Sequence, residues 1–217
     1  MSLAQRLWLL IHDLVFHNRI QVKPGNSMRV GFAERLRMKK VNIRIRGSGN
    51  SLSIGRGSMV ANCKIRIDGS DQAIDIGKDC LYHAGKIYLR YNKGQHIRIG
   101  DKTTIEDAYL LTDEDASIEI GSDCMFSKFV HLRAGDGHSV LDAESGKRIN
   151  RARNIIIGDR VWLGRAACIL KGAVIPEGCV VGAHAVVTRK YEKADCAIAG
   201  NPANVVREGI SWDRRML

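Results

Sequence analysis

One histidine of the chain lies in a stretch that is suited to acid–base chemistry. His138 is flanked by Asp136, Gly137 and Ser139 in a polar, glycine-rich segment that spans about residues 133–153. An imidazole titrates near neutrality, so it can take the proton of a hydroxyl group while that hydroxyl attacks a thioester. A loop histidine taken alone is more often without a role. The elements around His138 therefore decide whether a catalytic role can be assigned to it.

A strict six-residue repeat follows this polar segment. Aliphatic residues recur without interruption at positions 157, 163, 169, 175, 181 and 187. Neither the helical period of 3.6 residues nor the two-residue alternation of a strand produces this spacing. A period of six fits a triangular solenoid, in which each short face gives one aliphatic side chain to a central column and small residues form the corners. The repeat predicts an all-β fold, a β-helix.

A looser form of the repeat precedes the polar segment. Ile-Gly pairs at 54–55, 76–77, 99–100 and 120–121 each end a β-like run, and they are 22, 23 and 21 residues apart. Three hexads make about 18 residues, so each early coil is expected to carry a few extra residues at a corner. The segment 134–153 is the longest break in the repeat. Long loops in a compact scaffold are usually functional, which favours a role for His138 in a protruding loop.

The charge of the chain is strongly positive. Its net charge is +11, and residues 1–50 hold ten Lys and Arg side chains against two acidic ones. A basic surface attracts polyanions, which include nucleic acid, anionic lipid, acidic polysaccharide and the phosphates of a cofactor. Aromatic residues make up only 6% of the chain, and no stacking platform or helix-turn-helix pattern is present. Nucleic acid is therefore not an expected partner.

The N-terminal segment Leu3–Val15 has the apolar periodicity of one helical face. It carries Arg6, His12 and Asp13 and is too short to span a bilayer. We favour a helix that packs on the body of the protein or on a neighbouring subunit. The alternative is an interfacial helix that, with the basic stretch after it, holds the protein at the inner face of a membrane. No secretory signal is visible, so a cytoplasmic location is expected.

These patterns divide the chain into three parts. We expect an N-terminal helical and basic segment (1–40), a β-helix domain (41–206) with the loop 134–153 inserted, and a C-terminal tail (207–217). The six cysteines form no Cys-x-x-Cys pair, which argues against a zinc cluster or a redox motif. We expect their thiols to be reduced and mostly buried.

Four stretches resemble the hexapeptide-repeat O-acetyltransferases: GHSVLDAESGKRIN, IIIGDRVWLG, VIPEGCVVGAHAVVT and AIAGNPANVVRE. The similarity covers about residues 50–210, and the members nearest in pattern act on capsular polysaccharide, lipopolysaccharide and exopolysaccharide. The resemblance implies a left-handed parallel β-helix, a handedness that the periodicity does not reveal. It also implies acetyl-CoA as donor without a metal, a glycan acceptor, and a homotrimer with active sites between subunits. The charge of the chain suits an acidic glycan.

The resemblance further implies roles for particular residues. His138 corresponds to the catalytic histidine and Trp162 to a tryptophan beside the thioester and the acceptor. Asp136 is a candidate for orienting the imidazole, as are Glu106 and Asp107. The residues implied in CoA binding are Gly164, Arg165, Ala183, Thr188, Arg189, Lys190 and Arg207. Two of these depart from the family pattern, because Arg165 replaces a small or acidic residue and Lys190 is shifted by one position.

The mechanism implied is direct transfer, in which His138 accepts the proton of the acceptor hydroxyl and a backbone amide of Gly135–Ser139 stabilises the oxyanion. Three other functions stay open at this point. A small-molecule acetyltransferase of the serine or maltose type shares the fold, and a non-catalytic scaffold would not need the loop histidine. A γ-type carbonic anhydrase needs three zinc-binding histidines, and the spacing of His83, His96, His131, His138 and His184 does not match that pattern.

Overall fold

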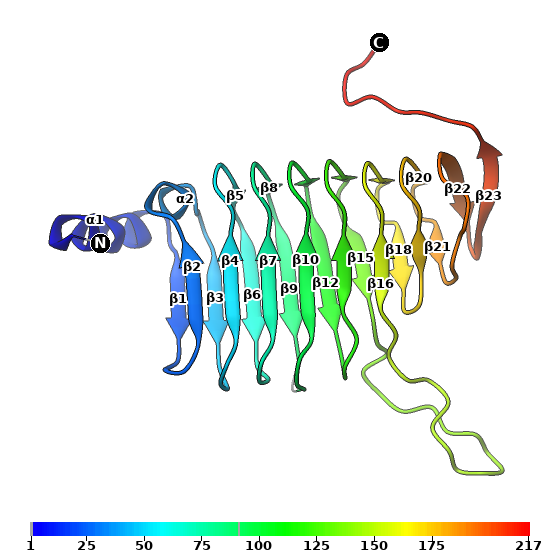
Figure 1. The fold of residues 1–217 in the computed structure, drawn as a ribbon, viewed down its shortest axis with the longest axis horizontal. Helices are drawn as coiled ribbons and strands as arrows, with labels where there is room; N and C mark the ends of the chain where they lie inside the picture. Colours follow the sequence, from blue (N-terminus) through cyan, green and yellow to red (C-terminus); the bar gives the residue numbers. More distant parts are fainter. Residues whose placement is uncertain (1, 91) are drawn as a thin grey trace.

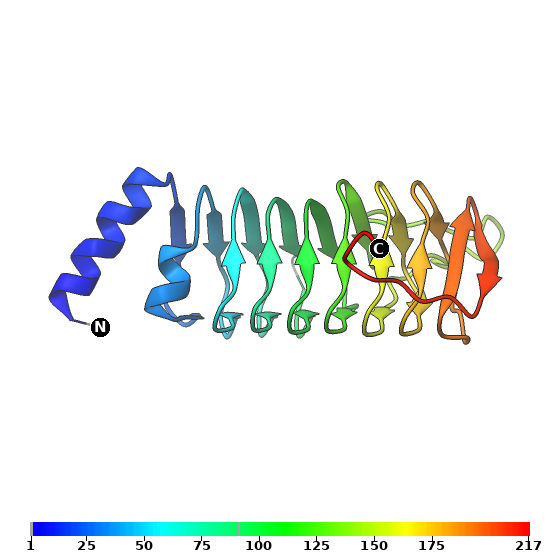
Figure 2. The same cartoon turned by 90° about the horizontal axis from the view of Figure 1, so that it is seen from above.

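Three parallel β-sheets form the sides of a long triangular prism (Figures 1 and 2). The computed structural model describes residues 2–90 and 92–217. Each full coil gives one strand to each sheet, and the path of the strands in Figure 1 advances along the axis in a left-handed sense. The left-handed parallel β-helix predicted from the repeat and the resemblance is confirmed.

The three sheets are named here in the order in which each coil visits them. Sheet 1 contains β1 (Arg19–Val22), β3 (Asn42–Ile45), β6 (Cys63–Ile67), β9 (Gly85–Leu89), β12 (Ala108–Thr112), β15 (Val130–Arg133), β18 (Cys168–Leu170) and β21 (Val186–Val187). Sheet 2 contains β2 (Ser27–Val30), β4 (Ser51–Ile54), β7 (Ala73–Ile76), β10 (His96–Ile99), β13 (Ile118–Ile120), β16 (Ile155–Ile157) and β19 (Val174–Ile175). Sheet 3 contains β5 (Met59–Val60), β8 (Leu81–Tyr82), β11 (Thr104–Ile105), β14 (Met125–Phe126), β17 (Trp162–Leu163), β20 (Val180–Val181), β22 (Cys196–Gly200) and β23 (Ala203–Glu208).

A column of buried aliphatic side chains runs along the axis. Ile54 pairs with Ile76 in the next coil, 22 residues later, whereas Ile157 pairs with Ile175, only 18 residues later. These isoleucines are at most 5% exposed. The strict hexad is therefore the region of minimal coils, and the early coils hold their extra residues at the corners, as predicted. Burial of each such side chain contributes about 1.5–3 kcal/mol.

The corner between sheets 2 and 3 is closed by stacked glycines. A Cβ atom added to Gly100 would lie 2.5 Å from the carbonyl carbon of Gly121 in the next coil. That distance is far below van der Waals contact, so only glycine allows the coils to approach this closely. In each Ile-Gly pair of the sequence, the isoleucine therefore packs in the core and the glycine forms the corner.

The first coil starts earlier than residue 41. Strand β1 begins at Arg19 and pairs in parallel with β3, so the parallel pairing reaches into the segment 1–40. The pairing was not visible in the sequence because this coil lacks the Ile-Gly pair. A short helix, α2 (Phe32–Leu36), replaces the regular corner.

Helix α1 (Leu3–Val15) projects beyond the N-terminal end of the prism (Figures 1 and 2). Its first turn is closed by a capping box, in which the Ser2 hydroxyl accepts from the Gln5 amide. Its apolar face does not pack on the body, since Leu3 is 84% and Leu14 is 80% exposed. Among the described residues, no helix is long and apolar enough to cross a membrane.

All six cysteines carry free thiols. Five are buried, and only Cys168 is partly exposed. Burial raises the pKa of the Cys124 thiol to about 12. Such a thiol carries almost no thiolate at neutral pH, which makes it a packing group and not a nucleophile.

Candidate active site

The long break in the repeat forms a loop that leaves the corner between sheets 1 and 2. Strand β15 ends at Arg133 and β16 begins at Ile155, and the chain between them extends away from the prism (Figure 1). The loop folds back on itself, and Leu141 and Arg148 form an antiparallel β-bridge within it. His138 lies before this bridge and is exposed to solvent. Its exposure leaves the imidazole accessible to a substrate.

Asn150 fixes the backbone of the loop around His138. Its side-chain amide donates to the carbonyl oxygen of His138 at 2.8 Å and to Oδ2 of Asp136 at 2.7 Å. Its Oδ1 accepts from the amide of Val140 at 2.7 Å and from Nε of Arg148 at 3.1 Å. One buried side chain therefore holds both ends of the segment that carries His138. No sequence pattern singles out Asn150.

Asp136 is bound to the prism and not to the imidazole. Its carboxylate accepts from Nζ of Lys171, whose ammonium group also donates to the Asn150 carbonyl at 3.0 Å. Partial burial alone would raise the pKa of Asp136, but the hydrogen bonds from Lys171 and Asn150 outweigh it and lower the pKa. The carboxylate is thus ionised at neutral pH and anchors the base of the loop to the corner after β18.

A hollow of about 230 Å³ lies beside His138. It is lined by Arg90, Asn92, Asp113, Glu114, Gly137, His138, Ser139 and Arg148. Asp113 is only 8% exposed, and its Oδ2 has no hydrogen-bond partner among the described residues. The preceding coil supplies Asp113 at the same corner, because Leu111 pairs with Arg133. Asp113 is a buried carboxylate of this corner that the sequence did not reveal.

Trp162 lies on a different side of the prism from His138. It belongs to β17 in sheet 3, where its indole Nε1 donates to Ser127 at 3.4 Å. His138 extends from the corner between sheets 1 and 2. Glu106 and Asp107 lie at a third place, the corner between β11 in sheet 3 and β12 in sheet 1. A single chain therefore does not bring these residues together with His138.

The C-terminal tail packs against Trp162, which stays partly exposed. After β23 the chain returns along sheet 3 (Figure 2), and the ring of Trp212 lies 6.2 Å from the ring of Trp162. Trp212 Nε1 donates to the Arg160 carbonyl at 2.7 Å. Arg214 donates to the Cys124 carbonyl at 2.9 Å and to Thr104 Oγ1 at 2.7 Å. We call residues 211–215 the strap, because they tie three successive coils together.

The residues implied in CoA binding fall into two groups and one outlier. Gly164, Arg165 and Ala183 lie at the corner between sheets 3 and 1. Thr188, Arg189 and Lys190 are exposed and follow β21 at the corner between sheets 1 and 2. Arg207 is exposed on β23. Both groups flank the last strands of sheet 1, on the C-terminal side of the His138 loop.

Two details bear on how these cations are held. The guanidinium of Arg165 lies over the ring of Phe129 at 5.4 Å. That of Arg189 lies over Tyr191 at 5.3 Å and donates to Asn204 Oδ1 at 2.6 Å. Gly164 is a stacking corner, since a Cβ there would lie 2.7 Å from the Ala183 amide nitrogen. Exposed cations beside such a narrow corner suit a phosphate-bearing ligand.

Metal ligation has no preformed centre in the part of the chain that the structure describes. No group of three or more His, Cys, Asp or Glu side chains there is arranged to hold a metal ion. His96, one of the histidines available for a zinc site, instead contacts Glu119 on the neighbouring coil of sheet 2.

Comparisons with known proteins agree on one group of enzymes. The chain is 35% identical over 170 residues to the polysialic acid O-acetyltransferase of Neisseria meningitidis, which covers 78% of each chain. It is 39% identical over 122 residues, or 56% of its length, to the polysialic acid O-acetyltransferase of Escherichia coli O1:K1 and spans 39% of that relative. The solved structure of the polySia-specific acetyltransferase NeuO matches 91% of this chain and 89% of its own, with a TM-score of 0.81 and 31% identity. No family model matches the chain.

The fold is that of the β-helix acetyltransferases. Within that class, the chain belongs to the hexapeptide-repeat O-acetyltransferase family that includes the polysialic acid O-acetyltransferases. The family membership inferred from the four sequence stretches is confirmed.

Proposed function

We propose that this protein transfers an acetyl group from acetyl-CoA to a hydroxyl group of an acidic surface polysaccharide or its precursor, with His138 as general base. The observation that carries the proposal is the fixed and exposed position of His138, whose carbonyl is held by Asn150. A general base must be accessible to the acceptor and held in a defined place. The relatives named above act on polysialic acid, an acidic sugar polymer, which supports the acceptor class.

The transfer needs no covalent enzyme intermediate. His138 takes the proton of the sugar hydroxyl, and the oxygen forms a bond to the acetyl carbonyl carbon. The tetrahedral oxyanion is stabilised by a backbone amide of the Gly135–Ser139 stretch. The carbon–sulfur bond then breaks, and the thiolate of CoA receives the proton from His138. The products are an O-acetyl ester and free CoA.

Acetyl-CoA is the donor that suits the C-terminal end of the prism. Its phosphates need exposed cations, which Arg165, Arg189, Lys190 and Arg207 provide. The pantetheine arm needs a narrow corner, which the close approach of Gly164 to the exposed Ala183 provides. Both groups lie on the C-terminal side of the His138 loop, so the thioester would point back toward the imidazole.

We further infer that the complete site is shared between copies in a homotrimer. His138 and Trp162 lie on different sides of one prism, so both contact one acceptor only if they come from different chains. The loop protrudes from its own prism (Figure 1), which supports a contribution to a site on another chain. In this arrangement, Trp162 forms a wall beside the thioester of the adjacent chain.

Replacement of the base tests the mechanism. His138→Ala should lower kcat by about 10²–10⁴-fold, the usual contribution of a general base. The variant should still bind CoA, because the candidate CoA residues are elsewhere. The matched control is His83→Ala, an exposed histidine at another corner, which should leave kcat unchanged. Near-normal turnover by His138→Ala would refute the assignment.

A mixing experiment tests whether sites are shared. His138→Ala and Trp162→Ala chains, each nearly inactive alone, are unfolded together and refolded as mixed oligomers. If each site takes His138 from one chain and Trp162 from another, some sites in the mixture contain both native residues, and activity returns. The activity of the mixture should reach a sizeable fraction of the activity of the wild-type protein. No recovery in mixed oligomers of confirmed composition would show that each site lies within one chain.

A further inference from the structure

The outer face of sheet 1 carries an unusual concentration of positive charge in its N-terminal coils. Arg44 and Arg66 lie side by side on β3 and β6, and Lys64 and Lys86 lie side by side on β6 and β9. Arg90 follows β9 at the end of the same sheet. Adjacent strands are about 4.8 Å apart, so each coil presents a cation within one strand spacing of the next.

A hollow of about 320 Å³ lies among these cations. Its lining contains four cations, Arg44, Lys64, Arg66 and Arg90, and one carboxylate, Asp68. Asp68 accepts from Arg44 at 3.2 Å, which leaves three positive charges without an acidic partner in the lining. This excess distinguishes the hollow from an ordinary salt-bridged surface.

Arg66 shows that the charges are held in place. It is only 9% exposed, and its guanidinium donates to the Asn42 carbonyl and to Asn42 Oδ1 at 2.9 and 3.0 Å. Burial, together with the nearby charge of Arg44, lowers the pKa of Arg66. Cations that repel one another in a fixed geometry are stabilised when an anion enters between them.

Aromatic side chains line the same face. Tyr88 contacts Tyr109 edge to face, with ring centroids 5.5 Å apart, and Tyr109 contacts His131 in the same way at 5.8 Å. Lys64 lies over the Tyr88 ring at 5.8 Å. Flat rings beside fixed cations suit a ligand that combines carboxylates with the apolar faces of sugar rings.

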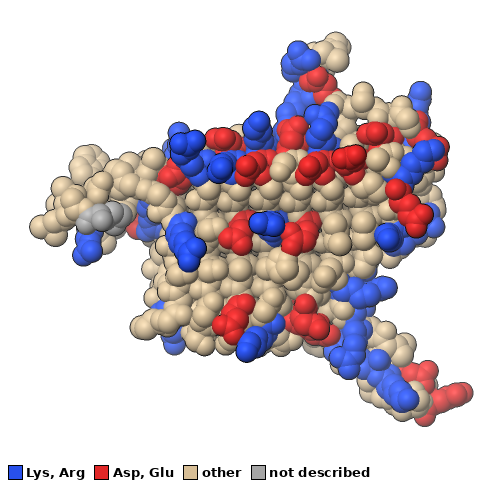
Figure 3. Space-filling view, viewed as in Figure 1, with Lys and Arg blue, Asp and Glu red and all other residues tan. Residues whose placement is uncertain are grey.

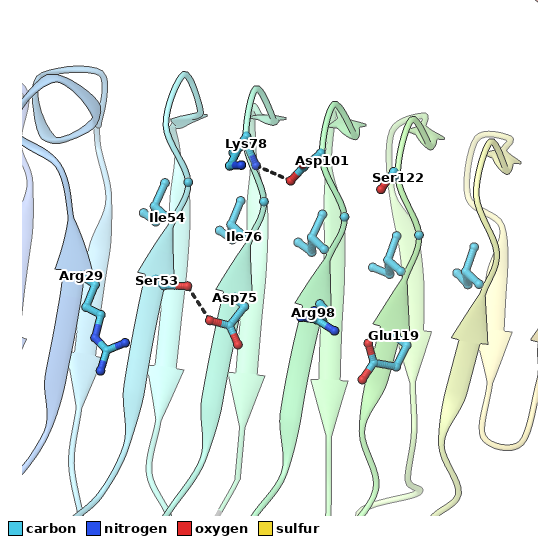
Figure 4. A pocket seen from close by; sticks show the side chains of 17 residues that line it. Arg29, Ser53, Ile54, Asp75, Ile76, Lys78, Arg98, Asp101, Glu119 and Ser122 are labelled. Atoms are coloured by element: carbon cyan, nitrogen blue, oxygen red, sulfur yellow. Dashed lines mark hydrogen bonds between the residues drawn. The ribbon is translucent and has the colours of Figure 1, made fainter.

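The outer face of sheet 2 is a natural comparison. A larger hollow of about 800 Å³ lies there, lined by Arg29, Lys78, Arg98, Asp75, Asp101 and Glu119. Its three cations and three carboxylates alternate along the coils (Figures 3 and 4), and Ser53 donates to Asp75 within it. The charges of sheet 2 therefore balance locally, whereas those of sheet 1 do not.

The positive hollow adjoins the hollow beside His138. Arg90 lines both the 320 Å³ hollow and the hollow beside His138. The candidate CoA residues lie on the other side of the loop, after β17. The N-terminal coils of sheet 1 are therefore the side from which an acceptor chain reaches His138 without crossing the donor.

We propose that Arg44, Lys64, Arg66, Tyr88 and Arg90, here named the basic track, bind several consecutive units of a carboxylate-bearing glycan and lead it to His138. The proposal rests on the proposed function for the reaction that follows. Binding to the track is a separate property, which is measured without acetyl transfer. The track would make the enzyme selective for polymers over single sugars, because each further unit meets a further cation.

The test combines binding and kinetics for the double variant Arg44→Gln/Lys64→Gln. Direct binding to polysialic acid, measured by titration without acetyl-CoA, should weaken about tenfold, and high salt should reduce the difference from wild type. KM for polysialic acid should rise by a similar factor and KM for acetyl-CoA should not. The matched control is Arg98→Gln on sheet 2, an exposed position, which should leave both values unchanged.

Two outcomes of this test would overturn the basic track, and a third would refute only the proposed function. Unchanged polymer binding by the double variant, with a wild-type melting temperature and oligomer mass, would overturn the track. A rise in KM for acetyl-CoA alone, with normal binding of polysialic acid, would overturn it in favour of a contact with the donor. Binding of polysialic acid through the track without any acetylation would uphold the track and refute the proposed function.

Discussion

His138 is a residue whose importance depends on its neighbours. Its position in the long break of the repeat singled it out in the sequence, and the structure places it exposed on a braced loop. The side chains that hold the loop in place were not predictable from the sequence. Asn150 is twelve residues away in a stretch without periodicity, and Lys171 reaches Asp136 only because two coils stack. Asp113 likewise needed the register of β12 and β15.

The bracing of the loop gives a prediction at the scale of one residue. Asn150→Ala removes the hydrogen bonds to the His138 carbonyl and to Asp136, so kcat should fall about 10–100-fold through misplacement of the base. The melting temperature should change little, because the loop lies outside the aliphatic column. Ser145→Ala, which removes a contact to Asp142 at the tip of the same loop, is the control and should keep wild-type kcat. An equal kcat for the two variants would contradict the role of Asn150.

Among the elements, the coils were the most predictable and the strap the least. A six-residue period leaves few alternatives to a triangular coil, so Ile157 and Ile175 were expected to stack, and they do. The strap has no periodicity. Trp212 and Arg214 gain their meaning only from tertiary contacts with residues about 50 to 110 positions earlier. Local sequence patterns carry no information about such contacts.

Arg214 is expected to keep the strap attached to the prism and so to keep Trp212 against Trp162. Arg214→Ala removes the hydrogen bonds to Cys124 and Thr104, so the tail should detach and leave Trp162 more exposed than in the wild type. Acrylamide should then quench the tryptophan fluorescence more strongly, and a protease should remove the tail faster. Arg215→Ala is the control, because the hydrogen bonds of that side chain go to Asp213 within the tail. The strap model fails if the two variants are quenched and cleaved alike.

For the molecule as a whole, the sequence revealed how much charge there is but not where it gathers. The early coils are 21 to 23 residues long, and the unequal corner insertions decide which side chains share a face. Only the register shows that sheet 2 balances its charges and that sheet 1 does not. The fold likewise places His138 and Trp162 on different sides of one prism. Handedness came from the family resemblance, because both hands share one period.

The product of the reaction tests the proposed function most directly. Purified protein is incubated with labelled acetyl-CoA and, in separate reactions, with polysialic acid, free sialic acid, dextran or serine, and each product is identified by mass and by its lability to mild alkali. We predict an alkali-labile acetyl ester on polysialic acid, little on the other acceptors, and none with His138→Ala. Acetylated serine, release of free acetate alone, or equal transfer by His138→Ala would contradict the account.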